Sequence, residues 1–242
     1  MLLKITKTKK ESKDSFSIIF KKPKRFNFYP GQYLDIEINL SFPRKRESIQ
    51  SRIFSISSSP SEDFLMVTYK EGVSPYKIAL QQLNAGDIVE SSHPAGTVVI
   101  DDSAPIVLLA GGIGIAPHRS MIKWAVDRKL NLPITLFYSN SDKDFIYKKE
   151  LDQWIKLYPK LTIHYVVTSK DGHLDHLKLQ KLLTSNLKSP TSHFPASPAG
   201  GPHLTSIHYL AGPPSMVDDF ENILINLGVD SVNIRTDRFD GY

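Results

Sequence analysis

The strongest constraint on the fold is a run of five apolar residues, 106–110, that leads into a glycine-rich turn. The run has the length of a strand and no polar position, as expected for a strand buried on both faces. Helix and strand patterns alternate after it: a helix through 129, a strand at 134–138, a helix at 143–157, a strand at 161–167, a helix at 175–183, a strand at 207–211, a helix at 214–227 and a closing strand at 232–234. This alternation predicts a parallel sheet with crossover helices.

The first hundred residues have a different rhythm, with short strands separated by turns. One short helical pattern lies at 76–83, and Pro30-Gly31, Ser59-Pro60 and Ala85-Gly86 are turn signals. The strand patterns are rich in β-branched and aromatic residues and lie at 16–20, 33–38, 53–56 and 64–69. Closely spaced strands of this kind are typical of a sandwich or barrel.

These two rhythms predict an α+β protein of two domains, with the change near Asp101-Asp102. Residues 1–101 are expected to form an antiparallel β-barrel, and residues 102–242 an α/β domain with a parallel sheet. Segments 41–50 and 189–206 fit neither pattern, and we expect both to be inserted surface loops.

Composition excludes several classes of function. None of the 242 residues is cysteine, which removes disulfides, thiolate zinc sites, iron–sulfur clusters and cysteine nucleophiles. The longest apolar run, 106–117, is shorter than the roughly 20 residues that a membrane-spanning helix needs. Lysines follow Met1 closely and leave no apolar core for a signal peptide. Without such segments we expect a cytoplasmic protein. The net charge of +5 is mild and partly concentrated at 44–46, so we expect no binding of nucleic acid.

The sharpest local signal is the turn Gly111-Gly112-Ile113-Gly114-Ile115-Ala116-Pro117, between the buried strand and the next helix. Gly112 and Gly114 allow the backbone to approach a ligand, and the helix start offers unpaired N–H groups with a partial positive charge. This geometry suits a phosphate group. The turn departs from the standard dinucleotide fingerprint, because Pro117 replaces the third glycine and no ribose-binding acid follows. A turn with only a structural role would give the same pattern.

A second signal is Arg52-Ile53-Phe54-Ser55, on a predicted strand of the first domain. Alternation along the strand places Arg52 and Phe54 on one side and Ile53 and Ser55 on the other. An arginine beside an exposed aromatic ring can hold a phosphate and stack a flat ring. An edge-strand arginine beside a core phenylalanine is the alternative interpretation.

Two further patterns remain ambiguous by themselves. Glu71-Gly72-Val73-Ser74 precedes the short helix, and Ser74-Pro75 is typical of a helix N-cap, so this segment is either a second anion site or an ordinary cap. His173 and His176 have a spacing that can bind metal on a helix, but no third ligand lies nearby in sequence. We therefore predict solvated histidines and no metal site.

Taken together and in this order, six segments resemble motifs of the ferredoxin–NADP reductase-like flavoprotein family, over nearly the whole chain. The segments are Arg52-Ile53-Phe54-Ser55, Glu71-Gly72-Val73-Ser74, Gly112-Ile113-Gly114-Ile115-Ala116-Pro117, Tyr138-Ser139-Asn140, Ala211-Gly212-Pro213-Pro214-Ser215-Met216 and Phe239-Asp240-Gly241-Tyr242. The resemblance implies FAD on the first domain, NAD(P)H on the second, and hydride transfer between nicotinamide C4 and flavin N5.

The resemblance also implies roles for individual residues. Ser55 would lie near flavin N5, and Tyr242 would cover the flavin face that the nicotinamide must reach. The implied FAD contacts are Arg52, Ile53, Phe54, Ser55, Tyr69, Gly72, Val73, Ser74 and Tyr242. The implied NAD(P)H contacts are Gly112, Ile113, Gly114, Pro117, Ser139, Asn140, Ser169, Lys170, Gly212, Pro213 and Met216. Ser169-Lys170 favours NADPH slightly, and the nearby Asp142 and Asp171 oppose a bound 2′-phosphate.

The chain departs from the family pattern at several positions: Phe54 lacks the hydroxyl of the commoner tyrosine, and Ala211 replaces the usual cysteine. Without cysteine the chain cannot pass electrons through a cluster of its own, so the resemblance implies a separate carrier such as a ferredoxin, a flavodoxin or another redox subunit, or a small oxidant. Two alternatives stay open. One is a non-catalytic nucleotide-binding or regulatory module on the same scaffold, and the other is a basic interaction protein that uses 44–46.

Overall fold

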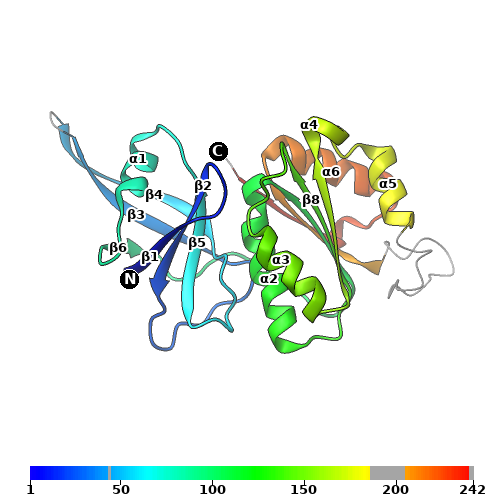
Figure 1. Cartoon of the computed structure of the whole chain (residues 1–242), viewed down its shortest axis with the longest axis horizontal. Helices are drawn as coiled ribbons and strands as arrows, with labels where there is room; N and C mark the ends of the chain where they lie inside the picture. The colour runs from blue at the N-terminus through cyan, green and yellow to red at the C-terminus, as the bar shows by residue number, and fades with distance from the viewer. Residues whose placement is uncertain (43–44, 186–204, 240–242) are drawn as a thin grey trace. The chain divides into compact units, whose positions relative to one another are not determined.

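The computed structural model describes residues 1–42, 45–185 and 205–239. By its internal contacts the chain divides into two compact units (Figure 1). The first unit contains Met1–Ile100 and Ala116–Trp124, and the second contains Asp101–Ile115 and the residues from Ala125 onward. The predicted change of architecture near Asp101 therefore coincides with a change of unit, although part of one helix belongs to the first.

The first unit is built on one six-stranded antiparallel sheet with the order β4-β3-β6-β1-β2-β5. Its edge strands meet at a bridge between Ile56, just after β4, and Val67 of β5. The sheet therefore closes on itself, as the predicted barrel requires. The elements are β1 (Leu2–Lys10), β2 (Ser15–Lys21), β3 (Tyr33–Phe42), β4 (Lys45–Ser55), β5 (Phe64–Lys70), α1 (Pro75–Gln82) and β6 (Ile88–Ser91).

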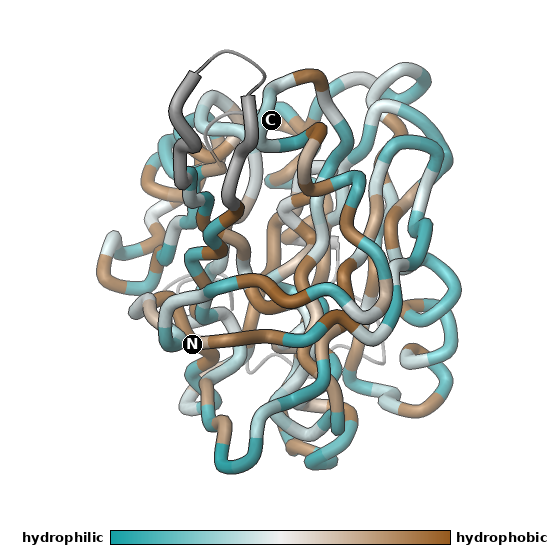
Figure 2. The backbone as a smooth tube through the Cα atoms, turned by 90° about the vertical axis from the view of Figure 1, so that its left-hand side faces the viewer, coloured by the Kyte–Doolittle hydropathy of each residue, from teal (hydrophilic) through white to brown (hydrophobic). Residues whose placement is uncertain are grey.

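Alternation along the strands fills the core of the first unit. Leu3 and Ile5 of β1 and Ile18 and Phe20 of β2 are almost completely buried. Figure 2 shows the hydrophobic residues along the backbone in brown. Helix α1 covers part of this core, and the hydroxyl of its buried Tyr76 donates a hydrogen bond of 2.8 Å to the carbonyl oxygen of Ile36. This bond fixes the start of α1 against β3.

The second unit contains a five-stranded parallel sheet with the order β11-β10-β7-β8-β9. Every residue of β7 and β10 is buried, which confirms the prediction of a strand covered on both faces. The strands are β7 (Ile106–Gly111), β8 (Ile134–Asn140), β9 (Leu161–Val167), β10 (Ile207–Gly212) and β11 (Ile234–Arg238). The helices are η1 (Gly112–Gly114), α2 (Ile115–Arg128), α3 (Lys148–Leu157), α4 (Thr168–Asp171), α5 (His176–Ser185), α6 (Pro214–Asn226) and η3 (Ser231–Asn233).

The structure corrects the interpretation of segment 41–50 as an inserted loop. Strands β3 and β4 continue through it as a hairpin, with Leu40 paired to Ser48 and Phe42 to Lys45. Positions 43–44 lie outside the described residues. Most of the second segment, 189–206, also lies outside them.

Two element boundaries also differ from prediction, and three elements were not predicted. Helix α3 begins at Lys148 rather than 143, because Tyr147 adopts a left-handed conformation with φ of 61° and Asn140, Asp142 and Asp144 form a hydrogen-bonded turn before it. The closing strand begins at Ile234, after the short η3 turn. Strands β1 and β6 and the short helix α4 were not predicted.

Candidate functional site

The carboxyl edge of the parallel sheet collects the residues of the glycine turn. The chain runs from β7 through β8 to β9, and then returns to β10 on the other side of β7. The carboxyl ends of β7 and β10 therefore form the topological switch point, the place where open α/β sheets bind ligands. Gly112 follows β7 at this point, and Gly212 ends β10.

Glycine is favoured at each of these positions for a different physical reason. An ideal Cβ on Gly114 would lie 2.0 Å from the carbonyl oxygen of Ala211, and one on Gly111 would lie 2.3 Å from Sδ of Met216. Packing against backbone requires the glycine at 114, whereas at 111 the flexible Met216 side chain would have to move. Gly112 has a φ of +51°, and a Cβ there would meet only Oδ1 of Asn140, at 3.9 Å. Its backbone is thus open to close approach by a ligand.

The start of α2 is free of side-chain capping. Gly114 is its N-cap residue and makes no side-chain capping hydrogen bond, so the first N–H groups of the helix have no such partner. The buried Tyr138 hydroxyl donates to the carbonyl oxygen of Gly112 at 3.0 Å and holds the turn, and burial raises the pKa of this phenol well above its usual value. The turn therefore has the geometry of a phosphate site.

Strands β8 and β9 bring a second group of predicted residues to the same edge of the sheet. The side-chain amide of Asn140 donates to Asp142 and to the carbonyl oxygen of Asp144. The backbone carbonyl oxygen of Asn140 accepts a hydrogen bond of 3.3 Å from the Thr168 hydroxyl. Ser169 and Lys170, on α4, are exposed beside this turn, since the Ser169 N–H donates to the carbonyl oxygen of Ser141. Ser139 is buried in the register position opposite Gly111.

The predicted residues after β10 pack against the glycine turn. Gly212 has a φ of +153°, and its carbonyl oxygen accepts a hydrogen bond of 2.9 Å from the N–H of Phe239. Pro213 is the N-cap residue of α6, and Met216 in its first turn contacts the position of Gly111. Gly112, Asn140, Gly212 and Met216 are thus assembled at one edge.

In the first unit, Arg52 and Phe54 of β4 share a face, as the alternation predicted. The guanidinium of Arg52 lies 5.4 Å from the ring centroid of Tyr76, and the Phe54 ring stacks on Tyr76 with 6.2 Å between centroids. Ile53 is 56% exposed on the other face. The expectation that Phe54 is an exposed aromatic is wrong: it is only 5% exposed, because Tyr76 from α1 covers its ring. Ser55 is also buried, at 7%.

The start of α1 gathers positive charge. The Ser74 hydroxyl caps the helix by accepting a hydrogen bond of 3.3 Å from the N–H of Lys77, and Pro75 follows it. Burial lowers the pKa of the Lys77 ammonium, and the neighbouring Lys70 lowers it further. With Arg52 over the adjacent Tyr76, these cations surround a helix N-terminus, an arrangement that a bound anion would stabilise. The two sequence interpretations, a cap and an anion site, are therefore compatible.

The neighbouring predicted residues differ in exposure. Val73 is 91% exposed, and the carbonyl oxygen of Gly72 accepts a hydrogen bond of 2.8 Å from the side chain of Gln81. Tyr69 is buried and stacks on Phe16 with 6.0 Å between centroids, and burial raises the pKa of its phenol. Val73 is thus open to a ligand, whereas a Cβ at Gly72 would lie 2.5 Å from Cδ of Lys77, and Tyr69 has a structural contact.

A buried ion pair in the first unit was missed by the sequence reasoning. The guanidinium of Arg119, 2% exposed, binds both carboxylate oxygens of Glu62 at 2.9 and 3.1 Å and donates to the carbonyl oxygen of Ser57 at 2.8 Å. The Ser120 hydroxyl donates to Ser58 at 2.6 Å. These bonds fix the segment that follows Ser55. The signal was available, because Arg119 has helical spacing with the apolar Ile115 and Ile122.

Other predictions have simpler outcomes. Tyr242 lies outside the described residues. Within the described ranges, no group of three or more histidine, aspartate or glutamate side chains is placed to hold a metal ion. No helix in that same part of the chain has the length and apolar character needed to cross a bilayer.

Comparisons with known proteins agree with this geometry. Residues 108–222 match the family described as "Oxidoreductase NAD-binding domain". Flavohemoprotein A of Dictyostelium discoideum is 28% identical over 224 residues, which covers 88% of this chain and 52% of that protein. Reductase component 1 of the terephthalate 1,2-dioxygenase of Comamonas sp. is 26% identical over 227 residues, 89% of this chain and 60% of that protein. The chain thus spans little more than half the length of these curated relatives.

Solved structures share the fold of this chain. Ferredoxin–NADP⁺ reductase from Neisseria gonorrhoeae, with bound FAD and NADP, has a TM-score of 0.75 at 19% identity and covers 98% of each chain. The flavohem-like FAD/NAD-binding domain of nitric oxide dioxygenase from Vibrio cholerae has the same score and coverage, also at 19% identity. Residues 108–222 of this chain therefore resemble oxidoreductase NAD-binding domains, and the chain has the two-domain fold of these solved reductase structures.

Proposed function

We propose that the protein is an FAD-dependent NAD(P)H oxidoreductase, in which residues 1–101 bind FAD and residues 102–242 bind NAD(P)H. One observation supports this proposal: a single chain contains two helix starts of different construction that each suit an anion, α1 beside Arg52 and α2 behind the glycine turn. Two phosphate-containing ligands are the simplest occupants. The bound FAD and NADP in the structure from Neisseria gonorrhoeae support the assignment of these ligands.

The residues of the second unit would bind and orient the nucleotide. Gly112 would admit the pyrophosphate to the α2 start, because its flank is open. Gly212, Pro213 and Met216 lie across the switch point from it and would contact the nicotinamide side. Ser139, Asn140, Ser169 and Lys170 lie along β8 and α4 and would contact the adenosine side, where Lys170 supports a slight preference for NADPH.

The residues of the first unit would hold the flavin. Arg52, Gly72, Val73 and Ser74 surround the start of α1 and suit the FAD pyrophosphate, while Ile53 and Ser55 belong to the same strand end. Phe54, which Tyr76 covers, would support the ring from the core and not from an open face. When bound, FAD supplies the acceptor for a hydride from NAD(P)H. The chain itself then needs only to orient and shield, and no general base is required.

The electrons would pass to a separate acceptor. None of these 242 residues is cysteine, so they hold no cysteine-bound iron–sulfur cluster. Two relatives support an external carrier by their names: the terephthalate dioxygenase reductase component and the ferredoxin–NAD(P)⁺ reductase component of naphthalene dioxygenase from Pseudomonas putida. We infer a ferredoxin, a flavodoxin or another redox subunit as partner. A cytoplasmic location stays a prediction that cell fractionation would test.

The decisive experiment is an anaerobic titration of purified protein, after incubation with FAD, with NADPH and separately with NADH. The proposal expects flavin absorption that bleaches upon addition of one nucleotide, and kcat/KM for the two nucleotides then settles the preference. Arg52→Gln should weaken FAD binding, whereas Lys156→Gln on α3 of the second unit serves as a charge-matched control. A protein that takes up no FAD and oxidises neither nucleotide would instead be a non-catalytic nucleotide-binding module.

A further inference from the structure

The start of the chain has a larger net positive charge than the whole chain. Residues 1–25 contain nine lysine or arginine side chains and two acidic ones, an excess of seven positive charges, while the whole chain has an excess of five. Everything after residue 25 is therefore slightly acidic. Such a local concentration calls for a structural explanation, because neither proposed cofactor site uses these residues.

Strand pairing places two of the lysines side by side on the outer face of the first sheet. Ile5 of β1 pairs with Phe20 of β2, and both are buried in the core. Lys4 precedes Ile5 and Lys21 follows Phe20, so the two lysines flank this pair on the same side, and alternation turns both outward. Like charges opposite each other on one face of a sheet are destabilising. A polyanion above the face would remove this repulsion.

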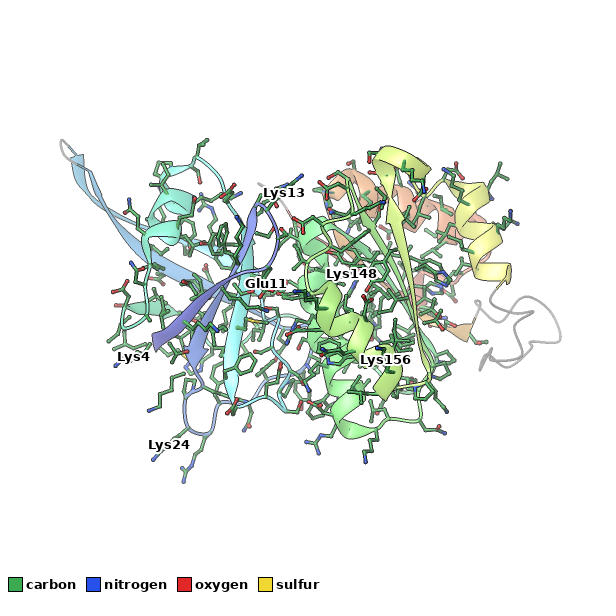
Figure 3. The ribbon with its side chains drawn as sticks, in the orientation of Figure 1. Lys4, Glu11, Lys13, Lys24, Lys148 and Lys156 are labelled. Atoms are coloured by element: carbon green, nitrogen blue, oxygen red, sulfur yellow. The ribbon has the colours of Figure 1, made fainter. Side chains whose placement is uncertain are left out.

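Further cations extend the same surface. Lys7 pairs with Ile19 beyond the bulge in β1, and Lys24 and Arg25 follow the end of β2. Lys4, Lys7, Lys21, Lys24 and Arg25 are all exposed, and none of them forms an ion pair with another described residue. Figure 3 shows Lys4 and Lys24 extending away from the ribbon. We call these five residues the basic face.

The other charges nearby are already compensated or lie at the margin. Lys22 donates to the carbonyl oxygens of Pro60 and Glu62, at 2.7 and 2.9 Å. Lys9 pairs with Glu11 at 2.9 Å. Glu90 of β6, which pairs with Leu2, is the acidic side chain next to the basic face. The charge of the basic face is thus not cancelled by the fold.

Two large aliphatic side chains project beside the lysines. Ile88 of β6 pairs directly with Lys4 and is 59% exposed, and Leu2 of β1 is 66% exposed. Protein–protein interfaces are depleted in lysine and enriched in arginine and aromatic residues. Lysines that surround exposed aliphatic side chains are instead typical of surfaces that lie on anionic lipid, where the cations contact headgroups and the apolar tips enter the interface.

We propose that the basic face, together with Leu2 and Ile88, docks the first unit on an anionic membrane surface. The interaction is peripheral, and its partners are lipid phosphate or carboxylate headgroups. It would hold a reductase close to acceptors in or on the membrane without a spanning segment. This proposal is independent of the proposed redox function, because neither the face nor its test requires a cofactor.

The test is sedimentation of the full chain with two kinds of vesicle, one of phosphatidylcholine alone and one containing phosphatidylglycerol. We expect binding only to the anionic vesicles, weakened by added salt. Lys4→Gln combined with Lys21→Gln should reduce the affinity about thirtyfold, the change that corresponds to about 1 kcal/mol for each lysine near an anionic surface. Lys149→Gln combined with Lys156→Gln removes the same charge from α3 and should leave binding unchanged.

A second pair of variants tests the aliphatic contribution. Ile88→Ser should weaken binding about fivefold, while Ile225→Ser, at an exposed position of α6, should not. Thermal unfolding confirms that all variants are folded. Three results would overturn the proposal: no binding to anionic vesicles, equal binding to neutral vesicles, or an equal loss in the α3 control. Binding to an acidic peptide or to DNA with no vesicle binding would assign the face to a macromolecular partner instead.

Discussion

Gly112 and Gly114 lie two residues apart in one turn, yet alanine should affect them in opposite ways. At position 114 the backbone φ of −59° suits any residue, so the whole cost of Gly114→Ala comes from overlap. Its Cβ would lie 2.0 Å from the carbonyl oxygen and 2.4 Å from the carbonyl carbon of Ala211, so β7 and β10 would have to separate. Overpacking costs about 1–3 kcal/mol, and we expect the upper end because the obstacle is backbone.

At position 112 the calculation differs. The left-handed φ of +51° destabilises an alanine by about 1–2 kcal/mol. Alanine also lowers the conformational entropy of the unfolded chain, which stabilises the folded protein by about 0.4–1 kcal/mol. The net loss of stability should therefore be between about 0 and 1.6 kcal/mol. The new methyl group would nevertheless occupy the open flank where the dinucleotide is proposed to approach. We expect NADPH affinity to fall by about tenfold or more, which corresponds to about 1.4 kcal/mol.

Two measurements separate these effects: urea unfolding gives the change in stability, and the rise in Tm on addition of NADPH reports binding. Gly86→Ala is the matched control, because its φ is +104°, nothing lies within 4 Å of its Cβ position, and it belongs to the first unit. If Gly112→Ala keeps the NADPH affinity of the unaltered protein, the nucleotide does not approach at Gly112. If Gly114→Ala unfolds like the unaltered protein, the turn is not tightly packed.

Three other predictions follow from single contacts. Glu62→Gln removes the carboxylate of a buried ion pair and should lower the free energy of unfolding by about 3 kcal/mol. Asp218→Asn, which removes an exposed partner of Arg238, should lower it by less than about 1 kcal/mol. Equal losses of unfolding free energy for the two variants, measured with urea, would contradict this. Burial lowers the pKa of His118 from 6.5 to about 3, so only the unfolded chain takes up a proton between these values. Stability should therefore decrease as the pH falls below 6.5, by about 1.4 kcal/mol per pH unit, and His118→Phe should flatten that slope in unfolding curves. Deletion of Tyr242 should tighten NAD(P)H binding about threefold to tenfold if this residue shields the flavin, and titration showing unchanged or weaker binding would exclude the role.

The parallel sheet was predictable because its central strands are buried on both faces. The continuous apolar sequence of β7 leaves no other environment for this segment, β10 departs from that pattern only at His208 and Tyr209, and the helices between them have regular spacing. Strands with one exposed face carry a weaker signal. In β1, only Leu3 and Ile5 are buried among lysines and threonines, so sequence reasoning missed the strand, although its pairing with β2 and β6 is extensive.

The candidate site was predictable to the level of segments and not of contacts. Spacing along β4 correctly placed Arg52 and Phe54 on one face. It could not show that Tyr76, more than twenty residues later, covers the Phe54 ring, because that contact depends on how α1 docks against β3. The same limit explains the Arg119–Glu62 ion pair, whose partners are separated by 57 positions in sequence.

The two helix starts also differ in how they can attract an anion. The start of α1 has Arg52 and Lys77 beside it, so much of its attraction comes from side-chain charge, which salt screens, while Lys70 nearby is paired with Asp14. The start of α2 offers backbone N–H groups behind Gly112, and Arg119 in its early turns is already bound by Glu62. Attraction there depends on close fit to the backbone, which salt weakens less. FAD and NADPH should therefore respond differently to ionic strength, with FAD binding the more sensitive, because the fold assigns mobile cations to one phosphate site and fixed dipoles to the other.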